Sequence, residues 1–526
     1  MAGSIVSAAS APAGVYAEAR RNGEQAAEVL ERCHRFVEGW LKHRDEKTGL
    51  IPQNLKSPVW TPENSAADLW PFMVLTCYWT DEELLAGAMR DILEAETRYT
   101  SRVGDLPDAY DFVKQGFARD QVDHAALMFA AAEYCKDGLL PIVELMGPGP
   151  YLDRLCSIAK GVCAESKTAS DFGPLPSDSA EVNGELLQAL SRLYFATRDA
   201  TFRDMALRIA DAYFLEVLPS NNGLPCHYWD FGTHQTRNDR LRLIDHGSEI
   251  VGGLSEAYVL AWATDRERFV RYHVPMRNMM KVLTENALNP EGFWYLELST
   301  RMLQVTNREV PDTWGYVHNA LYTYGIVAQQ PWAYEHVRRA LENIHKYPDW
   351  DGADGFADCI EGTLVLLNRI PVESAWQWAD EATARMSAKQ QADGIIEGWH
   401  GDGNVARTWL MYAMAKTGGV RAQPWRRDLR YGAVVRDGSL YLRLTAERPW
   451  QGKLHFDKPR YKVHMGLPIN YPRLNEMPAW FPLEKKARYQ VCVGAGKAVY
   501  SGRQLWQGLG VSIGAGETVL VEVSPA

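Results

Sequence analysis

The sequence predicts a mainly α-helical protein, an α/α toroid of six or seven helical hairpins, followed by a small antiparallel β-sandwich. The first observation behind this prediction is a glycine followed by apolar residues, which recurs about every 40 to 70 residues between two helical segments. These glycine segments are residues 49–52, 104–107, 173–176, 223–225, 292–294 and 394–396. A repeat at this period is typical of stacked helical hairpins.

The second observation is that the two helices of each hairpin differ. The first is amphipathic, as in residues 26–37, where apolar residues recur at helical spacing. The second is apolar on most sides and rich in small residues, which is typical of a buried helix. Such inner helices are expected to begin near residues 64, 123, 181, 246, 313, 355 and 403. In a closed ring, these seven starts would surround one central cavity.

The third observation is a change of pattern near Pro424. Apolar and polar residues alternate on both sides of Asp437-Gly438, a strong hairpin signal, and strands are also expected at 488–493, 509–513 and 518–523. Residues 466–481 form a long irregular loop, and such loops are usually functional or packed on a neighbour. We therefore expect a disordered leader over residues 1–18, the toroid over 19–422 and the β-sandwich over 425–526.

Composition excludes several classes of protein. The net charge is −10 and no basic tract occurs, which argues against a nucleic-acid partner. No apolar run approaches the length of a membrane-spanning helix, and the chain shows no secretory signal, so a cytoplasmic location is the default. A trimmed signal peptide around residues 8–11 is the alternative.

The eight cysteines form no CxxC pair, and no nucleotide or metal motif is present, so we expect no cofactor and no metal. The 18 tryptophans and 24 tyrosines suit either a core or the stacking of sugar rings.

Taken together, the hairpin ring, the glycine turns, the polar and aromatic starts of the inner helices and the trailing β-sandwich resemble the six-hairpin glycosidase-like superfamily. That superfamily contains glycoside hydrolases, unsaturated-glycuronyl hydrolases and polysaccharide lyases. The resemblance covers residues 20–420 and the β domain. It is architectural, so it implies carbohydrate chemistry without identifying the reaction.

Carboxylates at the inner-helix starts are the main catalytic candidates. Asp245 and Glu249 are four residues apart on one helix, as are Glu181 and Glu185. Asp354, Asp358 and Glu361 form a further stripe. Like charges on a buried face are costly unless something pairs or uses them. The predicted catalytic residues are Asp245, Glu249, Asp358, Glu361, His246 and Tyr316.

Aromatic and polar residues near the same helix starts are the candidates for substrate binding, although each also suits a structural role as a core residue or a helix cap. Arg407 suits either a substrate carboxylate or an ion pair with Asp402. The predicted substrate-binding residues are Trp60, Asn64, Asn183, Glu185, Trp229, Trp314, His318, Trp399, His400, Asp402 and Arg407.

Four functions follow from these residues. The preferred one is a glycoside hydrolase of oligo- or polysaccharides, with Asp245 or Glu249 paired against Asp358 or Glu361 as acid and base. The second is a polysaccharide lyase that acts on uronate-containing glycans. In the toroid lyases a Tyr, a His and an Asn perform the elimination, so the resemblance implies Tyr316 or His246 for that reaction. A sugar epimerase using His246 and His400, or a non-catalytic glycan-binding protein, are further alternatives. The sequence does not determine the oligomeric state.

Overall fold

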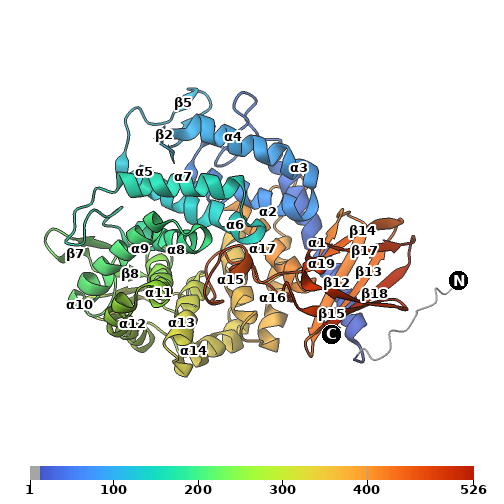
Figure 1. The fold of residues 1–526 in the computed structure, drawn as a ribbon. Helices are drawn as coiled ribbons and strands as arrows, with labels where there is room; N and C mark the ends of the chain where they lie inside the picture. The colour runs from blue at the N-terminus through green and yellow to red at the C-terminus, as the bar shows by residue number, and fades with distance from the viewer. Residues whose placement is uncertain (1–11, 400) are drawn as a thin grey trace.

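The computed structural model describes residues 12–399 and 401–526, and it confirms a ring of helical hairpins followed by a β domain (Figure 1). Over these residues seven outer helices alternate with seven inner segments. The outer helices are α1 (Val15–Leu41), α4 (Ala88–Thr100), α7 (Pro150–Glu165), α9 (Ala200–Ala212), α12 (Arg266–Asn286), α14 (Pro331–Asn343) and α16 (Glu373–Ser387). The inner segments are α2 (Trp70–Thr80), the run α5–η2–α6 (His124–Glu133, Tyr134–Leu139, Leu140–Met146), α8 (Ala180–Thr197), α11 (His246–Thr264), α13 (Trp314–Val327), α15 (Gly352–Leu367) and α17 (Asp402–Lys416). The last inner helix, α17, packs against α2, which closes the ring.

The turn glycines of the repeat adopt a backbone conformation that favours glycine. All six have φ between 56° and 100°. At Gly394 a Cβ atom would also lie 2.1 Å from the carbonyl oxygen of Arg35 on α1. The periodic glycine therefore marks the tight turn that leads from an outer helix toward the next inner helix.

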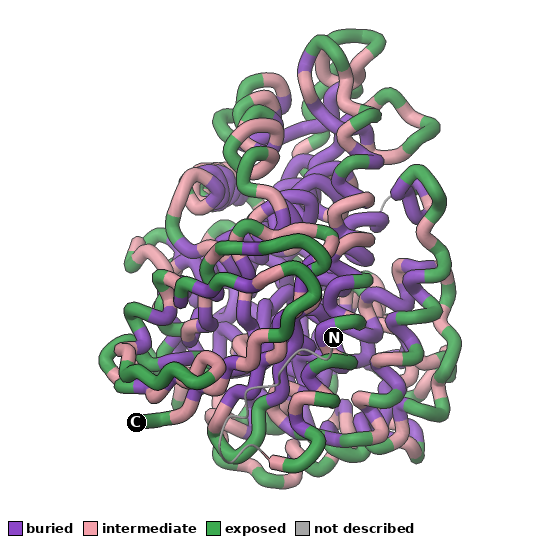
Figure 2. Tube along the Cα trace, turned by 90° about the vertical axis from the view of Figure 1, so that its right-hand side faces the viewer, coloured by how far each residue is buried: buried purple, intermediate pink, exposed green. Residues whose placement is uncertain are grey.

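Neighbouring inner helices touch through glycines at the level of the cavity. A Cβ on Gly184 of α8 would lie 2.4 Å from the backbone of Glu249 on α11, and one on Gly253 would lie 2.4 Å from the carbonyl oxygen of Gly184. Gly315 of α13 and Gly362 of α15 meet in the same way, at 2.6 Å. Backbone contact of this kind draws the inner helices close together, and the buried residues concentrate in the interior of the molecule (Figure 2).

The β domain confirms the predicted strands. Strands β12 (Leu429–Arg436) and β13 (Ser439–Ala446) pair across the two-residue turn Asp437-Gly438, where both residues have positive φ, as a type I′ turn requires. A five-stranded antiparallel sheet has the order β12-β13-β18-β15-β16, and a three-stranded one has the order β11-β14-β17. The remaining strands are β11 (Arg421–Gln423), β14 (Trp450–His455), β15 (Arg488–Val493), β16 (Gly496–Ser501), β17 (Leu509–Ile513) and β18 (Thr518–Pro525).

The domain limits differ from the prediction at two places. Helix α1 begins at Val15, so residues 15–18 are not part of a disordered leader, because Val15 and Ala19 are buried against Val434 and Tyr441 of the β domain. Residues 1–11 of that leader lie outside the described part of the chain. The β domain begins earlier than expected, since Arg421 already pairs with His455 of β14. Among the described residues, no helix has the length and apolar character needed to span a membrane.

The predicted long loop reaches into the ring. The segment between β14 and β15 contains the short helix α18 (Arg460–Val463), and its next residues extend from the β domain toward the ring centre (Figure 1). Arg473 forms a buried ion pair with Glu144 of α6, and Glu476 pairs with Arg369 at 2.7 Å. The backbone carbonyl of Leu474 accepts a hydrogen bond of 2.9 Å from Arg192 of α8. The β domain thus supplies a buried part of the toroid interior.

Candidate functional site

A chamber of about 220 Å³ lies where the inner helices converge, and six of the seven inner segments contribute to its wall, together with Asp68 just before α2. Nine carboxylates and two cationic side chains line it, so the chamber is strongly acidic. Its lining residues are Asp68, Glu133, Lys136, Asp137, Glu181, Glu185, Asp245, Ser248, Glu249, Thr313, Tyr316, Asp354, Asp358, Asn404, Arg407 and Leu474. The expectation that the inner-helix starts face one cavity is confirmed for α8, α11, α13, α15 and α17, whereas the α5–η2–α6 run contributes from its π-helical turn.

Asp245 presents an unpaired carboxylate to this chamber. It immediately precedes α11, with φ 44° and ψ −108°, and among the described residues its side chain neither caps the helix nor forms an ion pair. Glu249, one turn further along, accepts hydrogen bonds from Lys136 at 2.8 Å and Gln188 at 2.6 Å. Of the two predicted carboxylates on α11, Asp245 is therefore the available one and Glu249 is held in a network.

The wall formed by α15 and α17 has a second network. Arg407 lies 2.8 Å from Asp358 Oδ1 and 2.7 Å from Glu361 Oε2, so it forms ion pairs with α15. The predicted alternative, an ion pair with Asp402, is wrong. Glu361 also accepts hydrogen bonds from the Tyr316 hydroxyl at 3.0 Å and from the backbone N–H of Asn475 at 2.8 Å. Glu361 is 1% exposed and does not line the chamber, whereas Asp358 does.

Burial raises the pKa of several of these carboxyl groups. Asp354, Glu185 and Asp68 have pKa values well above the ordinary range, first through burial and then through neighbouring carboxylates. Burial raises the pKa of Glu249 to about 7, although Lys136 opposes that effect. The pKa of Asp245 is also raised, first by burial and then by the charge of Glu181. A carboxyl group with a raised pKa suits the role of a proton donor, so the chamber offers several candidate acids.

Three important residues were not predicted. Glu133, Lys136 and Asp137 lie at the π-helical turn Tyr134–Leu139, and π-turns are frequent at functional sites. Lys136 is buried and lies 2.7 Å from Asp137 and 2.8 Å from Glu249. No sequence pattern marks a π-turn inside a helical run, and the available signal was the group of charged residues Glu133, Lys136 and Asp137 within a largely apolar inner segment. Asp68 and Asn404 also line the chamber, while Asn475 contacts its wall residues from the β domain.

The predicted tryptophan platforms are wrong for Trp60, Trp229 and Trp314, which are at most 2% exposed. The indole of Trp60 packs edge-on against Tyr134, and that of Trp314 donates to Cys359 Sγ at 3.1 Å. The indole of Trp229 donates to Glu216 at 2.7 Å. These rings belong to the core because burial of their large apolar area stabilises the packed helices.

Several predicted polar binding residues also have structural roles. His318 is fully buried, its Nδ1 accepts a hydrogen bond of 2.6 Å from the indole N–H of Trp294, and its Nε2 donates to the carbonyl oxygen of Gly292 at 3.0 Å. Asn183 donates to the carbonyl of Ser177 at 2.8 Å, away from the chamber lining. These contacts fix turns and helix starts, so these two side chains are structural.

Of the remaining predicted residues that the structure describes, Glu185 alone lines the chamber. Asp402 accepts hydrogen bonds from the backbone N–H groups of Glu397 and Gly398 and so orders the loop before α17. Asn64 bonds to Gln53 and Thr61, and Trp399 bonds to Glu397 on that same loop. None of these three lines the chamber. Glu185 does line it, and neither of its carboxylate oxygens accepts a hydrogen bond from a described donor. His400 lies outside the described residues.

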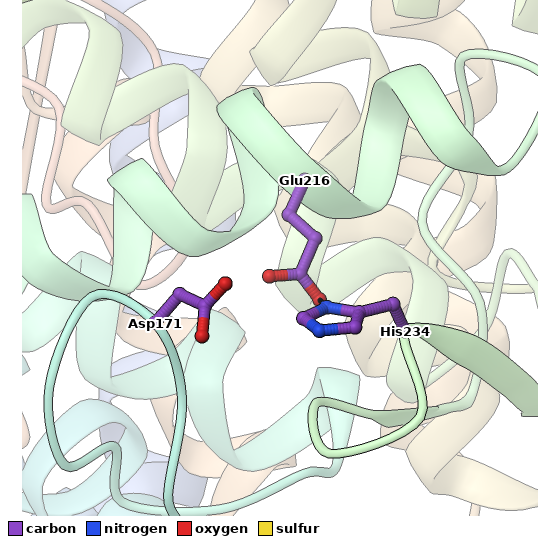
Figure 3. Close-up of side chains that lie close together, drawn as sticks. All are labelled: Asp171, Glu216 and His234. Atoms are coloured by element: carbon purple, nitrogen blue, oxygen red, sulfur yellow. Dashed lines mark hydrogen bonds and ion pairs between the residues drawn. The ribbon is translucent and has the colours of Figure 1, made fainter.

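Two clusters among the described residues have the spacing of metal ligands, with donor atoms within 4.8 Å of one another. Asp171, Glu216 and His234 form the first, on exposed loops and a helix edge (Figure 3). Glu216 already accepts hydrogen bonds from Trp229 and His234, which gives this cluster a structural explanation. The second cluster is Glu133, Glu181 and Glu185 in the chamber. There the ammonium of Lys136, 3.9 Å from Glu185, already supplies positive charge.

No protein-family model matches the chain, and no curated protein matches it. Several solved structures do. A sugar epimerase from a ruminal bacterium matches with a TM-score of 0.45 and 13% identity, over 62% of this chain and 87% of that one. Cellobiose 2-epimerase from Bacillus thermoamylovorans matches with a TM-score of 0.43 and 11% identity, over 73% of this chain and 98% of that one. The α-1,6-mannanase from Salegentibacter sp. matches with a TM-score of 0.41 and 11% identity, over 75% of this chain and 99% of that one. With TM-scores of 0.45 or less, these matches carry no argument about the reaction.

Proposed function

We propose that this protein is a carbohydrate-active enzyme, a glycoside hydrolase, whose acid and base are Asp245 and Asp358. The observation that carries the proposal is the difference between these two carboxylates in one chamber. Asp245 has no ion-pair partner among the described residues and has a raised pKa, whereas Asp358 is held by Arg407 at 2.8 Å. Two carboxyl groups in contrasting environments suit an acid that protonates the leaving oxygen and a carboxylate that activates water or attacks.

The neighbouring groups support these roles. Arg407 fixes the side chain of Asp358 through one oxygen, which leaves the other oxygen for the chamber. Glu249 and Glu361 have both carboxylate oxygens engaged, so they suit positioning better than proton transfer. The lyase alternative is less well supported, because the Tyr316 hydroxyl donates to Glu361 and burial raises the pKa of Tyr316 well above its usual range.

The test is incubation with neutral and uronate-containing oligosaccharides, followed by mass spectrometry of the products. Hydrolysis adds one water across the cleaved bond, a lyase yields an unsaturated uronate without added water, and an epimerase yields an isomer of unchanged mass. Asp245→Asn and Asp358→Asn are each expected to lower hydrolysis by about 10²–10⁴-fold, the usual contribution of an acid or base. The matched control is Asp349→Asn, a surface aspartate that is 80% exposed. Folded Asp245 and Asp358 variants with wild-type turnover would disprove the assignment.

A further inference from the structure

A second and more open cavity, of about 680 Å³, lies at the rim of the ring beside the chamber. One wall is the antiparallel sheet of β8 (Arg240–Arg242), β9 (Glu297–Ser299) and β10 (Gln304–Asn307). The other wall is formed by His227 and His246. We call this cavity the basic pocket, because Arg240, Arg242 and Arg308 line it with a single carboxylate, that of Glu297.

Glu297 compensates only one of the three arginines. Its carboxylate lies 3.3 Å from the guanidinium of Arg240 and accepts a hydrogen bond of 2.8 Å from Thr306. In the sheet register Arg242 stands opposite Glu297, yet among the described residues Arg242 forms no ion pair. In the described part of the chain, Arg308 forms a hydrogen bond with the hydroxyl of Tyr295 and lies over its ring, and it has no ion pair. Two guanidinium groups that form no ion pair among the described residues therefore line this cavity, and the charge of Arg242 also acts on Asp245 of the adjoining chamber.

The basic pocket and the acidic chamber share one partition. Asp245 lines the chamber, and the next residue, His246, lines the basic pocket. The Nδ1 atom of His246 lies 2.7 Å from Glu181, another chamber residue, and its ring packs against His227 with centroids 3.7 Å apart. A ligand whose sugar ring contacts Asp245 can therefore extend a substituent past His246 toward the arginines.

We propose that the basic pocket binds an anionic substituent, a carboxylate or a sulfate ester, of the sugar residue next to the bond that is cleaved. This inference rests on the proposed function, since it places the substrate in the chamber. Guanidinium groups bind such oxyanions through paired, charge-assisted hydrogen bonds. The polar side chains of Asn238, Thr306 and Asn307 complete a lining that suits a charged group better than an apolar one.

The test is calorimetric binding of D-glucuronate, D-glucose 6-sulfate, D-glucose and inorganic sulfate to the full chain. We expect at least one of the two anionic sugars to bind about tenfold or more tightly than glucose. The variant Arg242→Gln/Arg308→Gln should bind that sugar no better than glucose. The control Arg503→Gln, an exposed arginine of the β domain, should behave as wild type. The preferred anionic sugar distinguishes a carboxylate site from a sulfate site.

Three results would overturn the inference. They are equal affinity for glucose and both anionic sugars, unchanged anion affinity in the Arg242/Arg308 variant, and no binding of either anionic sugar at millimolar concentration. If inorganic sulfate binds as tightly as the sugar ester, the pocket is an anion site that does not recognise the sugar. The binding readout is independent of turnover. If Asp245→Asn keeps wild-type turnover but the arginine variant loses anion binding, the proposed function fails and the binding site stands.

Discussion

The side-chain amide of Asn475, in the β domain, donates a hydrogen bond of 2.6 Å to the carboxylate of Asp137 at the π-turn of the toroid. Its carbonyl oxygen accepts a hydrogen bond of 2.9 Å from Arg407. Asn475 has φ 56°, a conformation that asparagine tolerates better than most residues. One residue of the β domain therefore connects the Lys136 network to the Arg407 network.

We accordingly expect Asn475→Ala to disturb the site while the ring stays folded. Loss of two buried hydrogen bonds that involve charged groups should destabilise the protein by about 2–5 kcal/mol and misplace Arg407. Turnover should fall by about tenfold or more, because Asp358 loses its fixed partner. The control is Asn470→Ala, an exposed residue of the same loop that bonds to Arg369. Wild-type turnover in the folded Asn475 variant would show that the loop formed by residues 466–481 only fills the interior of the ring and does not position the site.

The contact between α8 and α11 makes a second prediction. Gly184→Ala would place a methyl group 2.4 Å from the backbone of Glu249. The helices must then separate, and we expect a loss of about 1–3 kcal/mol in the free energy of unfolding, even though alanine favours helix. Denaturant unfolding measures it, with Gly510→Ala as control, because a Cβ there meets nothing within 4 Å. Equal stability of the two variants would contradict the close packing.

The sequence predicted the architecture because helical periodicity and turn glycines are local signals. The seven inner-helix starts lie within a few residues of their predicted positions, apart from the first, where the π-helical turn Pro62–Ala66 precedes α2. Carboxylates four residues apart, such as Asp354 and Asp358, do share a wall of the chamber. Helix geometry alone fixes that relationship.

What the sequence could not predict depends on long-range contacts. Asn475 follows Glu361 by 114 positions, and no local pattern predicts that its backbone N–H donates to the Glu361 carboxylate at 2.8 Å. Whether a tryptophan is buried or stacks on a sugar depends on what packs above it, and Trp314 is covered by Phe293 and His318. The basic pocket was missed for the same reason, since its arginines and histidines come from three separate segments.

A third prediction concerns stability and pH. Burial raises the pKa of Glu133 to about 8 from an ordinary value of 4.5. The folded protein therefore holds this proton more tightly than the unfolded chain, so the contribution of Glu133 to stability falls as pH rises between these values. Glu133→Gln removes that loss. The stability difference, variant minus wild type, should increase from pH 5 to pH 9 by at least about 1.4 kcal/mol, the equivalent of one pKa unit. Thermal unfolding across this range measures the difference. A difference that stays constant, or falls with pH, would contradict the raised pKa of Glu133.

The last prediction tests Asp245 as the acid through its neighbour. An acid must be protonated to act, so hydrolysis should decline as pH rises through the pKa of Asp245, which forms the upper limb of the pH–rate profile. The charge of Glu181 is the second cause that raises this pKa, after burial. Glu181→Gln removes that charge and should lower the pKa of Asp245, which moves the upper limb of kcat/KM toward lower pH by up to about one unit. The control is Glu216→Gln, which removes a carboxylate outside the chamber and should leave the limb in place. If the upper limb stays in place or moves to higher pH in Glu181→Gln, the limb belongs to another group. The next residue to replace would then be Asp354, whose pKa is raised by burial and by the charge of Asp358.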